Sequence, residues 1–566
     1  MRTAYTSDQI RAAEAALMAT LPEGTLMERA ATGLAVACAR MLGGVYGSRV
    51  VLLVGGGDNG GDALYAGARL AARGVRVDAL LAGTRVHAAG LEALRRAGGR
   101  VTDLRPDHGP AGDPAPASPA PGTSGDPAPG SPARKTSEDP APGSPAPGIS
   151  EDPAGARAPR GGSGPTPGKR AEDPAGARVR DLLDAADLIV DGMLGIGGTG
   201  ALREPYATLA RLANDAPGEV VAVDVPSGVD ASSGRVEGPA VRADATVTFG
   251  AWKNGLLVDP GSGHAGRTEL VDIGLGPHLP DPDTAVLTDP DVAALLPRPG
   301  ASSDKYRRGV VGIAAGGERY TGAAVLAVGG ALRAGVGMVR YAGVAEPVAQ
   351  VRARWPEAVI TTLAPGEGVG EVGRVQAWVL GPGLGTGDEA RAIARSVLSS
   401  EVPVLVDADA LTLVAQDRSL LRRGAPVLVT PHAGELSRLI GVPRERIEAR
   451  RLENVRRAAA ELGVTVLLKG STTLVAEDGR PVRINPTGSP WLATGGTGDV
   501  LAGLAGALLA AGLSGYDAAS CAAYLHGIAG RRGPLTAWDV AEALPEAARS
   551  LVNGTGHGGS PAKLGG

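Results

Sequence analysis

Short apolar runs, each ending in a glycine- or aspartate-rich loop before a helical pattern, recur along most of this 566-residue chain. Residues 49–83 show a strand, a glycine turn, a helix and a second strand, and 182–200 and 219–230 each contain a further apolar strand that ends in a polar loop. Such alternation is typical of a parallel sheet covered by helices on both faces. The sequence therefore predicts an α/β fold whose first domain is a Rossmann-like parallel sheet.

The same pattern resumes after a proline-rich junction at 276–283. The expected strands of this second half are VVGIAA, GMVRYA, AWVLG, VPVLVDAD, PVLVTP and VTVLLKG. A chain of this length is long enough for two or three cores. We therefore expect one domain at 1–276, a second α/β domain at 285–552 and a flexible, glycine-rich tail at 553–566.

Residues 104–178 differ in composition from both flanks. They consist mainly of Pro, Ala, Gly, Ser and Asp, with the near-copies DPAPGSPA at 126–133 and 139–146. Such a segment buries too little apolar surface to offset its chain entropy, so we expect it to be disordered. Because strands of one sheet flank it on both sides, we interpret it as an insertion in the first domain, where loop closure penalises length only weakly.

Composition excludes several classes of protein. A formal net charge of −4 argues against a nucleic-acid-binding or membrane-surface protein. Cys38 and Cys521 lie far apart, so we expect neither disulfides nor a zinc site, and the cytoplasm is the expected location. The most apolar helix, at 500–513, is too short to span a bilayer. The N-terminus is expected to form a helix that begins at Thr6 or Ser7.

The glycine turn after the first strand has two possible interpretations. Gly55, Gly57 and Gly60 match GxGxxG between a strand and a helix. Asp78, at the expected end of the next strand, completes a dinucleotide-binding pattern. The full loop sequence, GGGDNGGD, instead places two carboxylates where a pyrophosphate would lie and would be repelled. The sequence therefore favours cation or proton chemistry at this turn.

Polar loops follow two further strands of the first half. Asp191 lies in VDGMLGIGGTG, and Asp224 and Ser227 lie in VDVPSGVD. Because the carboxyl ends of parallel strands converge on one crevice, we expect these side chains near Asn59 of the glycine turn. Their amide, carboxylate and hydroxyl oxygens suit a Mg-, Ca- or K-like cation. A helix N-cap explains any single aspartate, but polar loops at four equivalent positions favour a site.

The motifs DNGGD, VDGMLGIGGTG, VDVPSGVD and TFGAWKNGLL together resemble the NAD(P)H-hydrate epimerase domain, over residues 1–275 apart from the insertion. The resemblance implies potassium ligands at Asn59, Asp191 and Ser227. It also implies a binding site for the hydrated nicotinamide nucleotide, made by Asp58, Asn59, Gly60, Gly61, Asp62, Gly195, Ile196, Gly197, Gly198, Thr199, Gly200, Ala201 and Asp224. Asp58 stands where the family usually has Asn. We assign proton handling in this site to Asp224.

The segment NPTGSPWLATGGTGDVLAGLAGALLAAG, at 485–512, joins a glycine-rich turn to a strongly apolar helix. The N–H groups of Gly496, Thr497 and Gly498 are expected to point at one spot with the helix dipole behind them, which suits a phosphate or an oxyanion. Asp499 beside that spot is expected to take a proton from an attacking hydroxyl, help that contributes about 10²–10⁴-fold. The alternative is a capped buried helix, but GGTG is entropically unfavourable for a cap alone.

Other loops of the second half also follow strands. The loop Lys469-Gly470-Ser471-Thr472-Thr473 offers ammonium and hydroxyl groups to a nucleotide phosphate, and Gly381-Pro382-Gly383 allows close approach of the backbone to a ligand. His432, in TPHAGE, is a site candidate because it follows a strand, although a single His is more often structural. Asp407 and Asp409 are interpreted as loop or metal-proximal residues with no assigned role.

The motifs DKYRRG, ERYTGAAVLA, GPGLG, DADAL, TPHAGE, LKGSTT and NPTGSPWLATGGTGD together resemble the ADP/ATP-dependent NAD(P)H-hydrate dehydratase, a ribokinase-like domain, over about 285–550. The resemblance implies contacts with the hydrated cofactor at Ala323, Gly383, His432 and Asp499. It implies contacts with AMP or ADP at Lys469, Gly470, Ser471, Thr472, Thr473 and Gly498. Mg²⁺ is then expected to bind together with ADP.

Together the two resemblances imply a bifunctional repair enzyme. Its first domain would interconvert the R and S forms of NAD(P)H hydrate, and its second would use ADP to convert the S form to NAD(P)H, AMP and phosphate. The expected partners are NAD(P)H hydrate and ADP or ATP, with no nucleic acid and no membrane, and a homo-oligomer is expected.

Three rival hypotheses remain at this stage. One is a ribokinase-like kinase of a small hydroxymethyl heterocycle fused to a non-catalytic Rossmann-like module, which product analysis would distinguish. Another is an NAD-dependent oxidoreductase. The two aspartates of the glycine turn argue against it, because they would repel a pyrophosphate. The last makes the first domain a binding module, which potassium-dependent activity would exclude.

Overall fold

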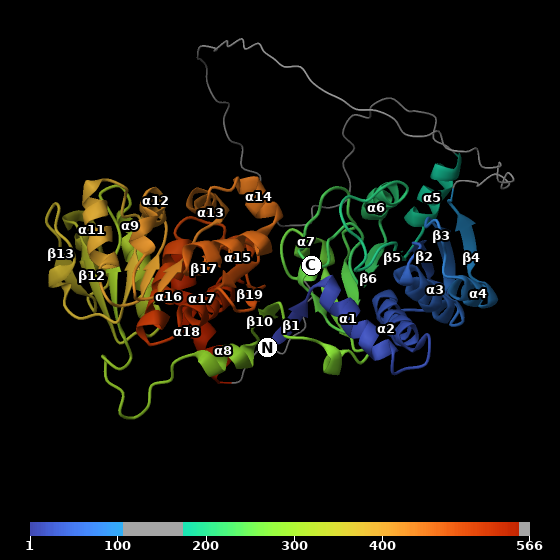
Figure 1. Ribbon diagram of the computed structural model, residues 1–566, viewed down its shortest axis with the longest axis horizontal. Coiled ribbons are helices and arrows are strands. Elements are labelled where there is room, and N and C mark those ends of the chain that lie inside the picture. Colours follow the sequence, from blue (N-terminus) through green and yellow to red (C-terminus); the bar gives the residue numbers. More distant parts are fainter. Residues whose placement is uncertain (106–173, 554–566) are drawn as a thin grey trace, which may run out of the picture. The chain divides into compact units, whose positions relative to one another are not determined.

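The computed structural model describes residues 1–105 and 174–553, and residues 1–104 and 174–553 belong to one compact unit. These residues form an α/β fold with two sheets, as the sequence predicts (Figure 1). Most of the expected insertion and tail lies outside the described residues. Helix α5 (Pro174–Asp184) begins inside the expected insertion, however, because Val179 and Leu183, one turn apart, are buried in a core of the first half.

The first sheet is entirely parallel, in the order β4-β3-β2-β5-β6-β7-β9. Its strands are β2 (Arg49–Val54), β3 (Arg76–Leu81), β4 (Arg100–Asp103), β5 (Leu188–Gly192), β6 (Glu219–Val223), β7 (Ala245–Phe249) and β9 (Arg267–Val271). The helices of this half are α1 (Ser7–Met18), α2 (Thr25–Leu42), α3 (Asp58–Ala71), α4 (Ala88–Arg96), α5, α6 (Tyr206–Asp215) and α7 (Ser262–Ala265).

Both faces of this sheet are buried. Along β2, Leu52 and Val54 pack in a core with residues of α2 and α3, whereas Val51 and Leu53 pack in a second core with residues of α5 and α6. Alternate side chains of a strand point to opposite faces, so the continuous apolar run of β2 serves both cores. The strand order reverses between β2 and β5, and ligands of open parallel sheets bind at such a point.

The second sheet begins with seven parallel strands in the order β13-β12-β11-β14-β15-β16-β17, followed by the antiparallel β18 and β19. The strands are β11 (Val310–Ala314), β12 (Met338–Gly343), β13 (Val359–Thr362), β14 (Ala377–Leu380), β15 (Val404–Val406), β16 (Val427–Val429), β17 (Thr465–Leu468), β18 (Thr473–Ala476) and β19 (Val482–Asn485). The sequence predicted six of these strands and missed β13, β18 and β19.

The second half has its own set of helices. They are α8 (Asp289–Leu295), α9 (Thr321–Arg333), α10 (Ala345–Arg354), α11 (Asp388–Leu398), α12 (Asp409–Gln416), α13 (Ala433–Ile440), α14 (Arg444–Ala449), α15 (Arg451–Leu462), α16 (Thr497–Ala510), α17 (Gly515–Ala529) and α18 (Ala537–Val552). Within the described ranges, no helix combines the length and the apolar character that crossing a membrane requires.

Glycines bring the apolar helix α16 very close to α9 (Figure 1). A Cβ atom on Gly330 of α9 would lie 2.3 Å from the carbonyl oxygen of Val500, and one on Gly503 of α16 would lie 1.9 Å from the oxygen of Ala327. Any larger residue at these two positions would separate the helices. This packing fixes the start of α16, where the GGTGD loop ends.

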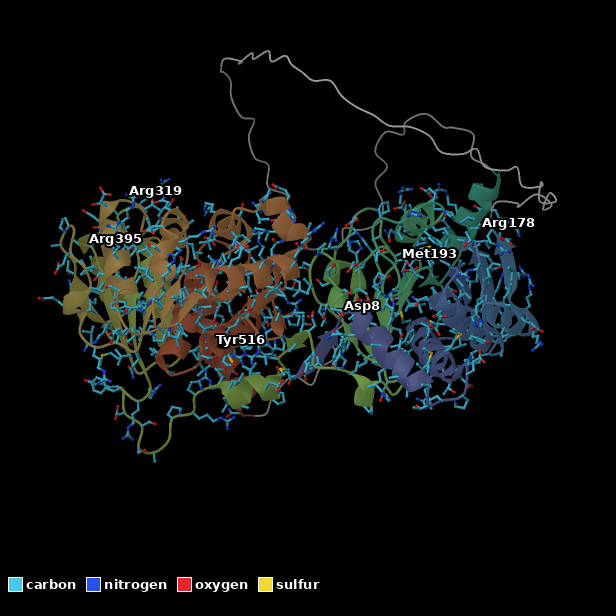
Figure 2. The ribbon with its side chains drawn as sticks, in the orientation of Figure 1. Asp8, Arg178, Met193, Arg319, Arg395 and Tyr516 are labelled. Carbon is cyan, nitrogen blue, oxygen red and sulfur yellow. The ribbon has the colours of Figure 1, made fainter. Side chains whose placement is uncertain are left out.

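Three further strands complete the second sheet, and two of them, β1 and β8, come from the first half. Beyond β19 lie β10 (Thr284–Val286), β1 (Arg2–Tyr5) and β8 (Trp252–Lys253), with β1 antiparallel to β10 and parallel to β8. Helix α1 follows β1 and begins at Ser7 after the N-cap Thr6, as expected from the sequence, and Asp8 lies in its first turn (Figure 2). The domain bounds 1–276 and 285–552 stay a prediction, because one sheet takes strands from both.

Candidate functional site

The glycine turn after β2 lies against the loops that follow β5 and β6. A Cβ atom on Gly55 would lie 1.8 Å from the carbonyl oxygen of Met193, a residue of the loop after β5 (Figure 2). Asn59, in the first turn of α3, donates a hydrogen bond of 2.6 Å from Nδ2 to the oxygen of Val223 at the end of β6. Its Oδ1 faces Gly195, where a Cβ atom would approach within 2.2 Å. The three loops therefore meet around Asn59, as the sequence predicts.

Asp191 and Ser227 form a buried pair beside these loops. The Ser227 hydroxyl donates to Asp191 Oδ1 at 2.7 Å, and the Ser227 N–H donates to Oδ2 at 2.8 Å. Burial raises the pKa of Asp191 to about 6, although the hydrogen bonds from Ser227 and Met193 act to lower it. A nearby cation would favour the ionised carboxylate.

The donor set of these loops fits a hard cation. It combines an amide oxygen of Asn59, the carboxylate of Asp191 and the hydroxyl of Ser227, which are the oxygen ligands that such cations prefer. Clusters of three or more His, Cys, Asp or Glu side chains with metal-binding geometry do not occur in residues 1–105 and 174–553.

Asp224 is held by a buried lysine that the sequence did not single out as a partner. The Lys253 ammonium contacts Asp224 Oδ1, and Thr248 and the Phe249 N–H donate to the same oxygen at 3.2 and 3.1 Å. Lys253 is 1% exposed, and it also donates to the Thr248 hydroxyl and to the Phe249 carbonyl. In the described part of the chain, these side-chain contacts of Asp224 all fall on Oδ1.

Further carboxyl groups surround this pair. Asp62 is buried, and its Oδ1 has no hydrogen-bond partner in the described residues. Burial, followed by repulsion from Asp224, Asp58 and Glu14, raises the pKa of Asp62 well above its usual value. Burial also raises the pKa of Glu14, on α1, to about 6. The site therefore holds protonatable carboxyl groups, as expected for proton chemistry rather than diphosphate binding.

The structure overturns one detail of the dinucleotide interpretation. Asp78 is the third residue of β3, where it is buried and lies 3.6 Å from Arg76 of the same strand, instead of standing at the strand's end. It cannot reach a ribose at the sheet edge. The exposed loop at 195–201 does lie at the site, and Arg11 of α1 donates to the Ile196 carbonyl at 3.0 Å.

In the second half, the GGTGD loop is held in place through the hydroxyl and the carbonyl of Thr497. The Thr497 hydroxyl bonds to the carbonyls of Leu492 and Thr494 at 2.8 and 3.0 Å. The buried His526 of α17 contacts the Thr497 carbonyl at 2.9 Å, and burial lowers its pKa to about 4. The Gly498 N–H lies in the first turn of α16, where helix N–H groups lack partners within the helix. The start of α16 is therefore held in place, and its N–H groups suit an anion.

Asp499 lies at this helix start, and within residues 1–105 and 174–553 it forms no ion pair with a lysine. Burial and repulsion from Asp407 raise its pKa to about 7. Lys469 lowers that pKa but pairs with Asp407 at 2.8 Å and lies 3.6 Å from Glu435. A Cβ atom on Gly498 would lie 3.7 Å from the Lys469 ammonium, so loop 469–473 borders the same site. Asp407 and Glu435, which the sequence left without a role, orient Lys469.

His432 has a structural role in addition to its position at the sheet edge. Its Nδ1 accepts from the Gly434 N–H at 3.0 Å and from the Glu435 N–H at 3.4 Å, and Glu435 accepts from the His432 N–H in return. This capping box begins α13. Burial lowers the pKa of His432, so the neutral ring is favoured. The His432 side chain is half-exposed, and its Nε2 lies 3.6 Å from Glu435 Oε1.

The predicted substrate residues Ala323 and Gly383 are in contact. A Cβ atom on Gly383 would lie 2.7 Å from the Ala323 Cβ and 2.8 Å from that of Tyr320. Tyr320 is 51% exposed, and the guanidinium carbon of Arg319 lies 5.3 Å from the centroid of its ring. Asp409 accepts from the Gly385 N–H at 2.8 Å and so supports this loop. Sequence reasoning missed Tyr320, although its exposed aromatic ring in ERYTG is a signal.

Two non-glycine residues of the described part have a left-handed backbone, Asp224 (φ 66°) and Ala408 (φ 50°). Asp224 directly follows β6, and Ala408 is the second residue after β15, at the edge where polar loops gather. Such conformations are unfavourable for residues with a Cβ atom and gather at functional sites. Both residues therefore lie at the carboxyl edge of the sheet of their half, where the side-chain contacts described above also lie.

Comparison with known proteins gives two family matches. The model of NAD(P)H-hydrate dehydratase matches residues 311–551, and that of the YjeF-related protein N-terminus matches 23–111 and 166–255. The bifunctional NAD(P)H-hydrate repair enzyme Nnr of Mycobacterium tuberculosis is 42% identical over 92% of this chain and 92% of that protein. The enzyme of that name from Mycobacterium leprae is 41% identical over 93% of each.

Among solved structures, the ADP/ATP-dependent NAD(P)H-hydrate dehydratase from Bacillus subtilis, co-crystallised with ATP and Mg²⁺, is similar to the chain. It is 30% identical, with a TM-score of 0.43, over 48% of this chain and 99% of that one.

Proposed function

This chain belongs to the family of bifunctional NAD(P)H-hydrate repair enzymes, and we propose how its residues divide the reaction between two sites. It is an NAD(P)H-hydrate epimerase and an ADP-dependent NAD(P)H-hydrate dehydratase in one polypeptide. The Rossmann-like first half interconverts the R and S hydrates. The ribokinase-like second half converts the S form and ADP to NAD(P)H, AMP and phosphate.

The dehydratase step needs a base because hydroxide is a poor leaving group. Asp499 takes the proton of the C6 hydroxyl while that oxygen attacks the β-phosphorus of ADP, which forms a C6 phosphate ester and releases AMP. The ring nitrogen then supplies the electron pair that expels phosphate, and loss of a C5 proton restores the dihydronicotinamide. The observation that carries this assignment is the half-buried Asp499 at the start of α16, with a pKa of about 7 and no lysine paired to it.

The remaining predicted residues of this site take binding roles. Lys469, Gly470, Ser471, Thr472, Thr473 and Gly498 bind the nucleotide phosphates, with Mg²⁺ accompanying ADP. Ala323, Gly383 and His432 contact the hydrated nicotinamide. The contact between Ala323 and Gly383 and the short approach of Gly498 to Lys469 support one shared cavity at the carboxyl ends of the parallel strands.

In the epimerase site, Asp224 handles the proton and Asn59, Asp191 and Ser227 hold a potassium ion. Asp191 and Ser227 are buried and Asn59 is partly buried, and a cation bound among them would favour the ionised form of Asp191. Potassium would supply positive charge near the hydrated ring. The exposed loop at 195–201 and the turn at 58–62 contact the substrate, with Asp58 in place of the usual amide.

A direct test supplies the intact protein with both hydrate epimers, ADP and magnesium, and follows the return of dihydronicotinamide absorbance. We expect complete recovery with equal amounts of AMP and phosphate. A stable phosphorylated product would contradict the dehydratase assignment, and recovery that stops at the S fraction would contradict the epimerase assignment. Potassium-dependent epimerisation that is lost in Asn59→Ala would support the cation site.

The cell biology of the enzyme is part of the same proposal. Both cysteines, Cys38 and Cys521, are buried free thiols, which supports a reducing, cytoplasmic location.

A homo-oligomer stays a prediction that sedimentation of the purified protein would check. ADP is proposed as the phosphoryl donor, with ATP as the alternative, and competition between the two nucleotides measures the preference.

A further inference from the structure

The loop at 469–473, which the proposed function assigns to the nucleotide, is held by a buried arginine behind it. Arg451, at the start of α15, is 6% exposed, and its Nη2 donates to the carbonyls of Lys469 and Thr472 at 3.1 and 3.2 Å. A Cβ atom on Gly470 would lie 2.3 Å from that nitrogen. The guanidinium therefore fixes the carbonyl side of the loop.

The opposite side of the loop is held by a residue of the first half. Asp259 Oδ2 accepts from both the N–H and the hydroxyl of Thr472, each at 2.8 Å, and the Asp259 N–H donates back to that hydroxyl at 3.2 Å. Thr472 is 7% exposed. Hydrogen bonds to an ionised carboxylate are roughly twice as strong as those between neutral groups. Attraction to Asp259 also acts to raise the pKa of Arg451, against the lowering by burial.

Asp259 is itself firmly placed. The preceding residue, Val258, is fully buried in a core of the second half, and Ser262 donates to the other carboxylate oxygen, Oδ1. Six residues earlier in the chain, Lys253 holds Asp224 of the epimerase site. One short segment, 253–259, thus contacts an aspartate of the first site and the nucleotide loop of the second.

We propose that Asp259 is a positioning residue for the dehydratase, contributed by the epimerase half to hold the nucleotide loop in its ADP-binding conformation. The inference rests on the proposed role of loop 469–473. Lys469 and the N–H groups of Gly470 and Ser471 must face the phosphates at fixed positions, whereas the Thr472 N–H and hydroxyl donate to Asp259 and tie the loop to it. Without Asp259, Thr472 loses this acceptor, and Arg451 still holds the carbonyl side of the loop.

The test measures ADP kinetics and binding in the intact Asp259→Ala protein. We expect KM for ADP to rise about tenfold, as for loss of charge-assisted hydrogen bonds, with kcat changed less than about twofold. Calorimetric Kd values for ADP and AMP should rise by the same factor. Asp259→Asn keeps the shape and one acceptor but not the charge, so its KM should lie between wild type and Asp259→Ala.

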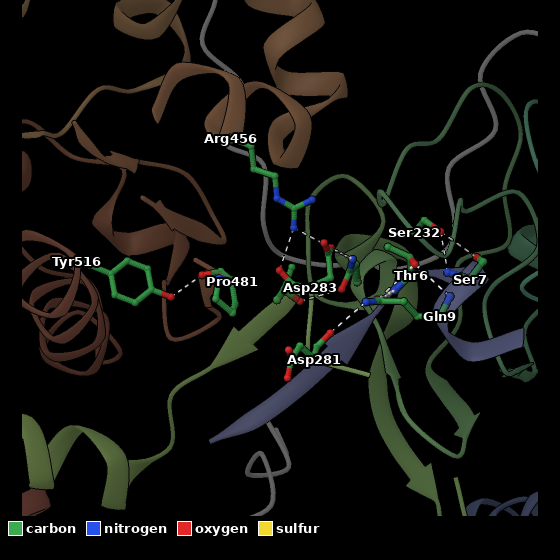
Figure 3. A network of polar contacts seen from close by, with 11 residues as sticks. Thr6, Ser7, Gln9, Ser232, Asp281, Asp283, Arg456, Pro481 and Tyr516 are labelled. Atoms are coloured by element: carbon green, nitrogen blue, oxygen red, sulfur yellow. Dashed lines mark hydrogen bonds and ion pairs between the residues drawn. The ribbon is translucent and has the colours of Figure 1, made fainter. Parts of the chain in front are cut away.

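Arg456→Ala is the matched control. Arg456 of α15 pairs with Asp283 of the junction at 2.7 Å (Figure 3), and Asn254 of the first half donates to Asp283 at 2.6 Å. Within the described residues, Arg456 forms no hydrogen bond or ion pair with loop 469–473. Its KM for ADP should stay at the wild-type value. All variants should keep the epimerase rate, which also reports that they fold. If Asp259→Ala loses that rate, Asp259→Asn carries the test, with an expected rise of about threefold.

Three outcomes separate the hypotheses. An unchanged KM and Kd for ADP in the Asp259 variants overturns the positioning role, as does an equal rise in Arg456→Ala, which would indicate general loosening. Wild-type protein without ADP-dependent repair contradicts the proposed function instead. In that case the calorimetric affinity for ADP and AMP still decides the role of Asp259, because it does not depend on turnover.

Discussion

The two halves place an aspartate and a lysine at corresponding edges of their sheets but connect them differently. In the first half Lys253 binds Asp224 directly and is completely buried. In the second half Lys469 binds Asp407 and Glu435, and within the described residues Asp499 forms no ion pair. Asp224 is thus in direct contact with a buried ammonium, whereas burial and repulsion from Asp407 raise the pKa of Asp499 to about 7. The two sites therefore differ in the carboxylate that the lysine contacts. In the first half it is Asp224, and in the second half it is Asp407 rather than Asp499.

The largest effect is expected when the unpaired aspartate loses its basicity. Asp499→Asn keeps the shape of the side chain but cannot accept the hydroxyl proton, so dehydratase kcat should fall about 10²–10⁴-fold. The rate of absorbance recovery from the S hydrate measures it. The rate of epimerisation should stay at the wild-type value. Chromatographic separation of the two hydrates measures this rate. A fall of less than tenfold would remove Asp499 from the role of base.

A large loss of stability is expected when the paired aspartate loses its lysine. Lys253→Met leaves the Asp224 carboxylate buried without compensation, which should lower the free energy of unfolding by about 3–5 kcal/mol. Urea denaturation of the intact protein measures the change. The double variant Lys253→Met/Asp224→Leu removes both charges and should recover part of the stability. Equal stability of wild type and Lys253→Met would show that the pair is not buried in solution.

A smaller change in rate is expected from the paired aspartate itself. Asp224→Asn should slow epimerisation about 10²-fold, the lower end of the range for acid–base residues, because Asp62 and Glu14 provide other protonatable groups nearby. With both hydrates, ADP and magnesium, absorbance should recover quickly to about half and then slowly. Full, fast recovery would contradict the role of Asp224, provided that spontaneous epimerisation is slow under the same conditions.

The smallest effect concerns pH. The base form of Asp499 must be ionised, so kcat/KM for the hydrate should rise with pH through about 7 and level off above it. Asp407→Asn removes the main repulsive charge, lowers the pKa of Asp499 and should move this rise to lower pH. Asp409→Asn removes a weaker contribution, so its shift should be smaller in the same direction. A shift to higher pH in either variant would contradict this account.

The sequence predicted the parallel strands and the loops at their ends because both depend on local patterns. Asp191 pairs with Ser227, and Asn59 bonds to the end of β6, since parallel strands bring their carboxyl ends to one edge. The order of strands and the extra strands β18 and β19 were not visible, because their pairing depends on long-range packing. Asp78 was placed wrongly because an acidic residue inside a buried strand looks like a strand end.

The partners of the charged residues were beyond the reach of the sequence. Lys253 lies 29 positions from Asp224 and Lys469 lies 62 positions from Asp407, and neither spacing belongs to a local motif. Arg451 stands in an ordinary, arginine-rich helix, and only its burial reveals that it holds loop 469–473. Ion pairs between distant segments depend on the complete fold, so they had to be observed.

The shared second sheet has a consequence for protein engineering. Strand β10 pairs on one side with β19 and on the other with β1 from the first residues of the chain. A C-terminal fragment cut at the junction near 285 would therefore expose an unpaired strand edge, a template for aggregation. Swapping in an epimerase half from another source would meet the same obstacle unless its first strand matched the register Arg2–Val286. The two activities are thus better separated by point substitutions than by truncation.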